Sequence, residues 1–324
     1  MPATSTAENR PLIRFAWLTL SFFLLVVLWG AVVRATGSGG GCGSNWPLCN
    51  GYINPLHHPR LNTIIEFAHR QSTTVASCMM AILAIWTFRT TPKGHRARKA
   101  VLWTIFLLIT EALLGAALVL RHWVENNYST GRVIAQAVHF TNTLLLMAAL
   151  ALTAWFLTHA NSHQADHTKR STPQRREKGI ALLALLSTIV VGATGALAAL
   201  ADTLFPSPTL TAALAQDFAT HAPLLVRMRW LHPAAAGIAL CCVLWMTHTA
   251  GYKDRLSRTV LALLALQIVL GIADVLLLAP IWMQLLHLLG ADLYWIALVL
   301  LASDALWPSI PATLKSFSTF ATAT

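Results

Sequence analysis

Long apolar stretches alternate with short polar ones along the whole chain. Eight apolar runs can be marked out, at residues 15–33, 63–88, 100–120, 133–157, 179–201, 225–248, 259–278 and 281–301. A helix rises about 1.5 Å per residue and needs about 20 residues to cross the roughly 30 Å hydrocarbon core of a bilayer. Each run is close to this length. The pattern therefore predicts an all-α membrane protein with eight transmembrane helices.

Composition and charge support a membrane location. Hydrophobic residues make up 56% of the chain and charged residues 11%, which leaves too little polar surface for a soluble protein. The net charge of +11 could indicate a nucleic-acid partner, but the basic residues are placed otherwise. They cluster at residues 10–14, 89–99, 169–178 and 253–258, which places them in every second polar stretch and therefore on one side of the membrane. By the positive-inside rule this predicts a multi-pass protein of the cell membrane with both termini in the cytoplasm and no nucleic-acid partner.

Four histidines occupy matching places in the even-numbered runs. His69, His139, His232 and His287 each lie six or seven residues after the start of an apolar run. With the first helix starting inside, these four runs all cross from outside to inside. At about 1.5 Å per residue, each histidine then lies about 10 Å below the outer surface. We expect all four side chains to be level with one another, toward the outer face.

The two halves of the chain repeat each other. Residues 114–120 (Leu-Gly-Ala-Ala-Leu-Val-Leu) align with residues 270–276 (Leu-Gly-Ile-Ala-Asp-Val-Leu). Three further pairs of positions match in the same way: Glu111 with Gln267, Gln136-x-x-His139 with Gln284-x-x-His287, and Glu66-x-x-His69 with Arg229-x-x-His232. A polar linker separates the two units. The repeat predicts two pseudo-symmetric four-helix bundles, residues 1–165 and 166–324, each with two of the level histidines.

A pair of level histidines in a four-helix bundle is a common way to bind haem iron through both axial positions. Zinc fits less well, because it prefers tetrahedral sites with more ligands and the second half places no third ligand beside His232 and His287. Other interpretations remain open. A single intramembrane histidine is often only a hydrogen-bonded polar residue, and in a transporter the histidines would relay protons. A transporter would be expected to have broken central helices. The histidine-bearing runs show little of that beyond Pro233, which predicts a local kink in the sixth run.

The two predicted sites differ in the residue that lies one helical turn before their first histidine. Glu66 lies three residues before His69, on the same helix face, whereas Arg229 occupies the matching place before His232. The carboxylate of Glu66 can form an ion pair with Arg70 at i+4. Alternatively, it can accept protons or stabilise positive charge beside the first-half site, as a catalytic group would. The sequence leaves both roles open.

Several arginines lie near the outer helix ends, against the positive-inside rule. They are Arg34, Arg60, Arg70, Arg121, Arg132, Arg227 and Arg229. Such residues can contact lipid headgroups, or they can bind an anionic group such as a haem propionate. Several of them lie close in sequence to the histidines. The candidates for binding propionates are Arg34, Arg70 and Arg229. Two acidic residues inside apolar runs, Asp274 and Asp292, receive no role from the sequence.

The first outer loop contains two cysteines, Cys42 and Cys49, in a segment rich in glycine. Two cysteines that close a short loop in an oxidising compartment most simply form a disulfide. The bond can be a structural staple or a redox-active pair, and the sequence does not decide between them.

The chain resembles the heme A synthase family. The segments that carry the resemblance are residues 35–39 (Ala-Thr-Gly-Ser-Gly) leading to Cys42, residues 46–49 (Trp-Pro-Leu-Cys) and residues 66–70 (Glu-Phe-Ala-His-Arg). The histidines of the second half complete the pattern, so the resemblance covers nearly the whole chain. One departure is that the outer loop of the second half, residues 202–223, lacks the cysteine pair that some family members carry there.

The resemblance implies an oxidoreductase that converts the C8 methyl group of heme O to a formyl group, giving heme A for terminal oxidases. It implies that Glu66 is catalytic and that His69 and His139 bind the iron of the substrate haem. It also implies that His232 and His287 bind a haem b cofactor. Heme O synthase and terminal oxidase assembly factors would be partners. The alternative is a dihaem cytochrome b that transfers electrons without changing the macrocycle.

Overall fold

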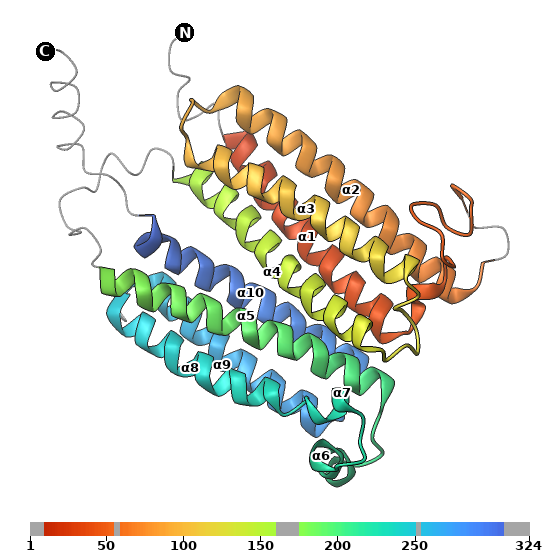
Figure 1. The fold of residues 1–324 in the computed structure, drawn as a ribbon. Helices are drawn as coiled ribbons and strands as arrows, with labels where there is room; N and C mark the ends of the chain where they lie inside the picture. The colour runs from red at the N-terminus through yellow and green to blue at the C-terminus, as the bar shows by residue number, and fades with distance from the viewer. Residues whose placement is uncertain (1–9, 55–58, 160–174, 251–253, 308–324) are drawn as a thin grey trace, which may run out of the picture.

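The computed structural model describes residues 10–54, 59–159, 175–250 and 254–307, and most of these residues are helical (Figure 1). Within them, eight helical segments are long and apolar enough to cross a membrane. They are α1 (Arg10–Ala35), α2 (Leu61–Thr90), α3 (Arg96–Leu120), α4 (Thr130–Thr158), α5 (Arg175–Leu204), α7 (Leu224–Arg227) with α8 (Leu231–Ala250), α9 (Arg255–Leu276) and α10 (Ile281–Leu306). The predicted spans are confirmed, and the chain is a multi-pass membrane protein.

Helices α4 and α10 form the centre of the molecule. In each of them 61% of the most apolar window is buried within the protein, against 11–28% in the other spans. The indole Nε1 of Trp295 on α10 donates a hydrogen bond of 2.7 Å to the backbone oxygen of Leu144 on α4. The remaining helices surround this pair and keep many large apolar side chains on their outer faces. Such faces suit contact with lipid, where an exposed apolar surface has no cost.

The helices pack in the same order in the two halves. Helix α1 packs on α2 and α3 on α4, and in the second half α5 packs on α8 and α9 on α10. The halves meet where α4 contacts α5 and α10, and where α1 contacts α10. In Figure 1 the first four helices accordingly lie together on one side, and α5, α8, α9 and α10 on the other. This agrees with the repeat, while the pseudo-symmetry and the cytoplasmic position of the termini stay predictions.

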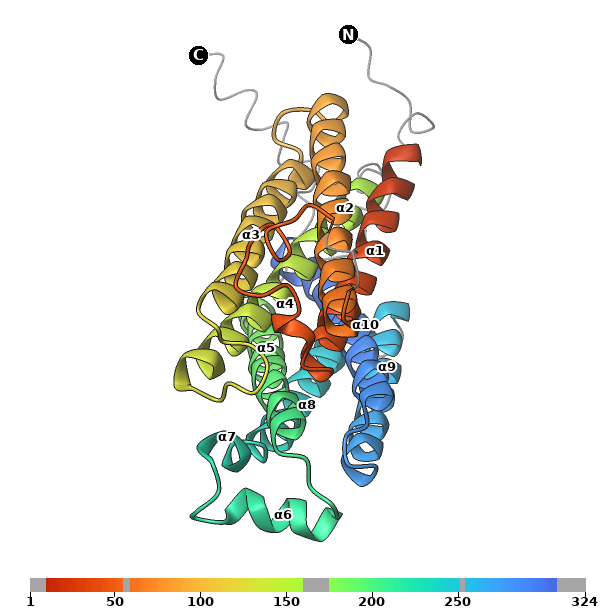
Figure 2. The same cartoon turned by 90° about the vertical axis from the view of Figure 1, so that its right-hand side faces the viewer.

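One end of the bundle, here called the loop end, carries residues 36–54, 121–129 and 205–223, and α1 begins and α10 ends at the opposite end (Figure 1). The loop end contains a short 3-10 helix, η1 (Ser38–Gly40), and a nine-residue helix, α6 (Leu210–Phe218). The backbone nitrogen of Ala212 donates to the Oγ1 of Thr209, which caps α6 at its start. Figure 2 shows α6 beyond the ends of the spanning helices, where the sequence predicted only a loop.

The sixth span is broken next to a histidine. Helix α7 ends at Arg227 and α8 begins at Leu231, so Pro233 is the third residue of α8. Proline has no N–H to donate and its ring clashes with the carbonyl four residues earlier, which prevents one continuous helix through residue 229. In the first turn of a new helix, however, that N–H is not needed. The local kink expected at Pro233 is therefore a break, and His232 lies at the start of α8.

Candidate functional site

Each of the four histidines packs against a glycine on a neighbouring spanning helix. The ring of His69 on α2 lies against Gly30 of α1, and the other three histidines repeat this arrangement. A methyl carbon built on the glycine would approach the ring Cε1 to 3.2 Å for Gly30 and His69, 3.9 Å for Gly115 and His139, 2.8 Å for Gly195 and His232, and 3.1 Å for Gly271 and His287. Three of these distances are shorter than ordinary carbon contacts of about 3.5–4.0 Å. The missing side chain is therefore what lets the ring lie between the helices.

These glycines were not predicted to be site residues from the sequence. Gly115 and Gly271 served only to align the two halves, and Gly30 and Gly195 were not singled out. The available signal was a glycine inside each apolar run that precedes a histidine-bearing run. A glycine within a helix usually needs a packing reason, because it costs about 0.5–1 kcal/mol relative to alanine.

The histidines of the second half face each other. The ring centroids of His232 and His287 are 6.2 Å apart and the ring planes are 86° from parallel. The Nδ1 of His232 lies 3.1 Å from the backbone oxygen of Val191 on α5. An Nδ1–H that donates to this carbonyl leaves Nε2 as the unprotonated nitrogen, which is the usual arrangement of a metal-binding histidine. Since histidine–metal bonds are about 2 Å long, one iron between the two rings fits this separation.

The other histidines differ in their polar neighbours. The amide Nε2 of Gln267 on α9 lies 3.0 Å from the Nδ1 of His287 and donates to the backbone oxygen of His287 at 2.9 Å. In the first half, the Oε1 of Glu111 on α3 lies 3.5 Å from the Nδ1 of His139. The Nδ1 of His69 is buried and has no hydrogen-bond partner among the described residues. The Nδ1 of His139 is likewise buried without a hydrogen-bond partner in that part of the chain.

The carboxylate of Glu66 is 3% exposed and fully engaged by the first outer loop and Arg70. Its Oε2 accepts a hydrogen bond of 2.8 Å from the backbone nitrogen of Cys42. Its Oε1 accepts bonds from the Nη2 and the Nε of Arg70, at 2.5 and 3.1 Å. The ion pair that the sequence allowed is thus present. Glu66 ties the helix of His69 to the cysteine-containing loop.

That loop is closed by a disulfide between Cys42 and Cys49, as predicted, and both residues are buried. The Nη1 of Arg70 donates to the backbone oxygens of Asn45 and Leu48, at 2.8 Å each. The predicted propionate ligand Arg70 therefore also holds the loop against α2.

The two other propionate candidates also donate to protein groups. The Nη1 of Arg34 on α1 donates to the Oγ1 of Thr203 at 2.7 Å, and its Nη2 donates to the Oε1 of Gln284 at 2.8 Å. Arg34 therefore crosses from the first half to α5 and α10 of the second. Arg229 pairs with Asp202 on α5 and Asp217 on α6, at 2.9 and 2.7 Å. This arginine joins the loop-end helix α6 to the bundle.

The two acids without a predicted role lie in different surroundings. Asp292 on α10 is 1% exposed, and neither of its carboxylate oxygens has a partner among the described residues. Asp274 lies near the end of α9, and its Oδ1 is buried and likewise unpartnered within the described chain. The structure adds no chemical role for either residue.

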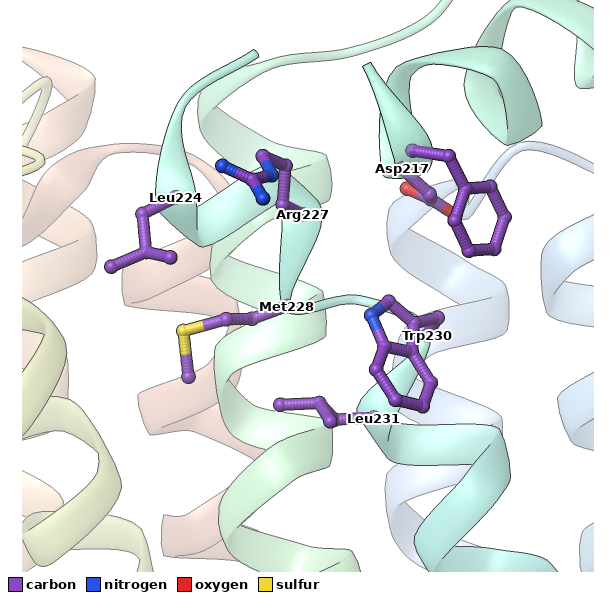
Figure 3. A pocket seen from close by; sticks show the side chains of 7 residues that line it. Asp217, Leu224, Arg227, Met228, Trp230 and Leu231 are labelled. Carbon is purple, nitrogen blue, oxygen red and sulfur yellow. The ribbon is translucent and has the colours of Figure 1, made fainter. Parts of the chain in front are cut away.

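A pocket of about 310 Å³ opens at the loop end of the second half (Figure 3). Helices α6, α7 and the start of α8 line it, with Leu224, Met228, Trp230 and Leu231 as labelled apolar side chains. Its lining includes none of the four histidines. The candidate site is therefore defined by the histidine and glycine pairs and not by this pocket.

These features define a class of protein: a helical membrane protein with four histidines set against glycines between its helices, two in each half. The model of the cytochrome oxidase assembly protein family matches residues 13–299, so the chain belongs to this family. A heme A synthase of Staphylococcus haemolyticus is 28% identical over 306 residues, which cover 88% of this chain and 94% of that protein. The expected relation to heme A synthases is confirmed.

Two further relatives are matched over part of their length. A protoheme IX farnesyltransferase of Thermus thermophilus is 39% identical over 299 residues, 90% of this chain and 48% of that protein. A heme A synthase of Shouchella clausii is 30% identical over 190 residues, 58% of this chain and 59% of that protein. The chain thus spans about half the length of the Thermus relative.

Proposed function

We propose that this protein is a heme A synthase, which oxidises the C8 methyl group of heme O to a formyl group. Membership of the cytochrome oxidase assembly protein family over residues 13–299 carries this proposal. The match to the Staphylococcus protein supports it, because that alignment covers 94% of a protein named heme A synthase. The Thermus protein bears a different name, but about half of it lies outside the alignment. A name given to the whole of that protein need not describe the matched half.

The second half is proposed to hold haem b as its cofactor. The perpendicular rings of His232 and His287 and the hydrogen bond from His232 to Val191 fit axial binding of an iron. When bound, haem b supplies one-electron chemistry. The glycines Gly195 and Gly271 leave room for the rings, and the hydrogen bond orients the ring of His232.

The first half is proposed to bind the substrate, heme O, through His69 and His139. The propionates would lie toward the loop end, where Arg34 of α1 and Arg70 of α2 carry positive charge. Glu66 is the proposed catalytic residue. It lies one turn from His69 and can accept a proton or stabilise positive charge as the methyl group is oxidised.

The cellular setting follows from the same proposal. The protein would lie in the cell membrane with its haem sites toward the outer face, as the basic clusters predict. It would receive heme O from heme O synthase and supply heme A to the assembly of terminal oxidases.

The decisive experiment is to purify the protein from cells with and without heme O synthase and to identify its haems by chromatography and mass. Heme O and heme A should be present only when the upstream enzyme is present, and haem b in both cases. Two haem b groups with no heme A under either condition would instead identify a dihaem electron-transfer protein. His232→Ala or His287→Ala should remove the haem b spectrum and leave the helix content unchanged.

The role of Glu66 needs a matched control, because it is also the ion-pair partner of Arg70. Glu66→Gln should let heme O accumulate while heme A falls strongly. Arg70→Gln breaks the same ion pair and leaves the carboxylate in place. Because Arg70 is also a proposed propionate ligand, heme A is compared per first-half haem bound. Equal loss on that scale in the two variants would make the ion pair the explanation, and normal heme A in Glu66→Gln would exclude a catalytic role.

A further inference from the structure

We infer that Glu111 is a positioning residue that makes the first-half histidine site harder to reduce than the second, where Gln267 occupies the matching place. The inference rests on the proposed function in one respect, namely that each half binds a haem. It concerns the reduction potentials of the two sites, which would be equal if the two halves were identical.

Glu111 lies beside one histidine of the first half and accepts hydrogen bonds from the same helix. Its Oε1 is 3.5 Å from the Nδ1 of His139, and that nitrogen is buried without a hydrogen-bond partner in the described part of the chain. A small rotation of the ring would bring the two atoms within hydrogen-bond distance. An iron bound at the other ring nitrogen requires this Nδ1 to carry the proton, and the carboxylate is its nearest recorded acceptor.

Two side chains of α4 hold the carboxyl group of Glu111 in place. The Nδ2 of Asn142 donates to its Oε2 at 2.6 Å, and the Oγ1 of Thr143 donates to its Oε1. The side-chain oxygen of Asn142 in turn accepts a bond of 2.8 Å from Thr110. The Oγ1 of Thr143 also lies 3.0 Å from the backbone oxygen of His139, so α4 holds the carboxyl group of Glu111 beside the same histidine.

The second half lacks both of these polar side chains at the matching positions. With His139 aligned to His287, Asn142 corresponds to Gly290 and Thr143 to Ala291, and neither replacement has a side-chain donor. A methyl carbon on Gly290 would lie 2.5 Å from the Oε1 of Gln267, so the glycine makes room for the amide. The two polar side chains of α4 are therefore absent in the half where an amide replaces the carboxyl group.

A carboxylate and an amide act differently on a metal-bound histidine. A carboxylate that accepts the Nδ1–H makes the ring a stronger electron donor, which stabilises the oxidised metal and lowers its reduction potential. Gln267 is neutral, and its amide lies 3.0 Å from the Nδ1 of His287. With iron at the other ring nitrogen, the Nδ1–H could be accepted only by the amide oxygen, which is a weaker acceptor than a carboxylate. The first-half haem should therefore have the lower potential of the two.

The test is a redox titration of the purified protein with both haems bound, monitored by optical and electron paramagnetic resonance spectra. The signals are assigned by the variants His139→Ala and His287→Ala, each of which should remove one of them. Glu111→Gln should raise the potential of the first-half haem and leave the second unchanged. We expect about a tenfold change in relative affinity for the two oxidation states, which is about 59 mV for one electron.

A second variant separates charge from simple disruption. Thr143→Val removes a donor from Glu111, which leaves more of its negative charge directed at His139, so the potential should fall where Glu111→Gln makes it rise. Changes of the same sign in both variants, or no change in either, would overturn the inference while leaving the proposed function intact. A protein loaded in cells that make heme O but lacking any first-half haem signal would overturn both.

Discussion

The packing of each histidine ring on a glycine leads to a graded prediction. Alanine replaces glycine in one variant at a time at the four positions Gly30, Gly115, Gly195 and Gly271. Within a helix this change normally stabilises the protein by about 0.5–1 kcal/mol, because glycine loses more backbone entropy on folding. A loss of haem cannot then be ascribed to a weaker helix. It must come from the contact between the new methyl group and the ring.

The size of the effect follows from the contact distances. At Gly195 the new carbon would lie 2.8 Å from the Cε1 of His232, so the ring must retreat by about 0.7 Å to reach an ordinary carbon contact. Metal–ligand distances tolerate only about 0.2 Å. We therefore expect haem affinity to fall about 10- to 100-fold, or by about 1.4–2.7 kcal/mol. At Gly115 the corresponding distance to His139 is 3.9 Å, and no loss is expected.

The measurement is the haem content of each purified variant, determined separately for the two halves from their spectra, with helix content by circular dichroism as the control. The expected order of loss is Gly195 first, Gly271 and Gly30 next, at 3.1 and 3.2 Å, and Gly115 last. Full haem occupancy in Gly195→Ala with an unshifted spectrum would refute the reasoning. So would equal losses at Gly195 and Gly115.

Three further predictions concern the loop end and the core. Alkylation of Cys42 and Cys49 should occur only after reduction, and Cys42→Ser with Cys49→Ser should lower the thermal midpoint of unfolding, since a disulfide typically contributes about 2–4 kcal/mol. Arg229→Ala removes the ion-pair partner of Asp202 and Asp217, so limited proteolysis should cut residues 205–223 faster. Arg229→Lys should give an intermediate cleavage rate, because an ammonium group cannot bind both carboxylates in the way that the forked guanidinium group does. Asp292→Asn should leave expression and the thermal midpoint of unfolding nearly unchanged, because a buried carboxyl group without a partner is tolerated only when it is neutral. A strong destabilisation would show instead that the charge of Asp292 stabilises the fold.

The sequence by itself determined the features that depend on local pattern. The length and polarity of the apolar runs predicted eight spans, because a bilayer imposes about 20 apolar residues on any helix that crosses it. The spacing of Cys42 and Cys49 predicted their disulfide, because only a short loop separates them. The repeated positions of the four histidines indicated that they form the site, and each of the four lies against a glycine.

Only the tertiary structure decided which distant residues meet. Nothing local in the sequence shows that Arg34 reaches Gln284, 250 positions away, or that Glu66 accepts a bond from the backbone of Cys42. The break before Pro233 was predicted only as a kink, since the clash of a proline with an earlier carbonyl can bend a helix or end it. Which of these results occurs depends on the surrounding packing. Such contacts depend on how helices approach one another, a choice made by the whole bundle and not by any single segment.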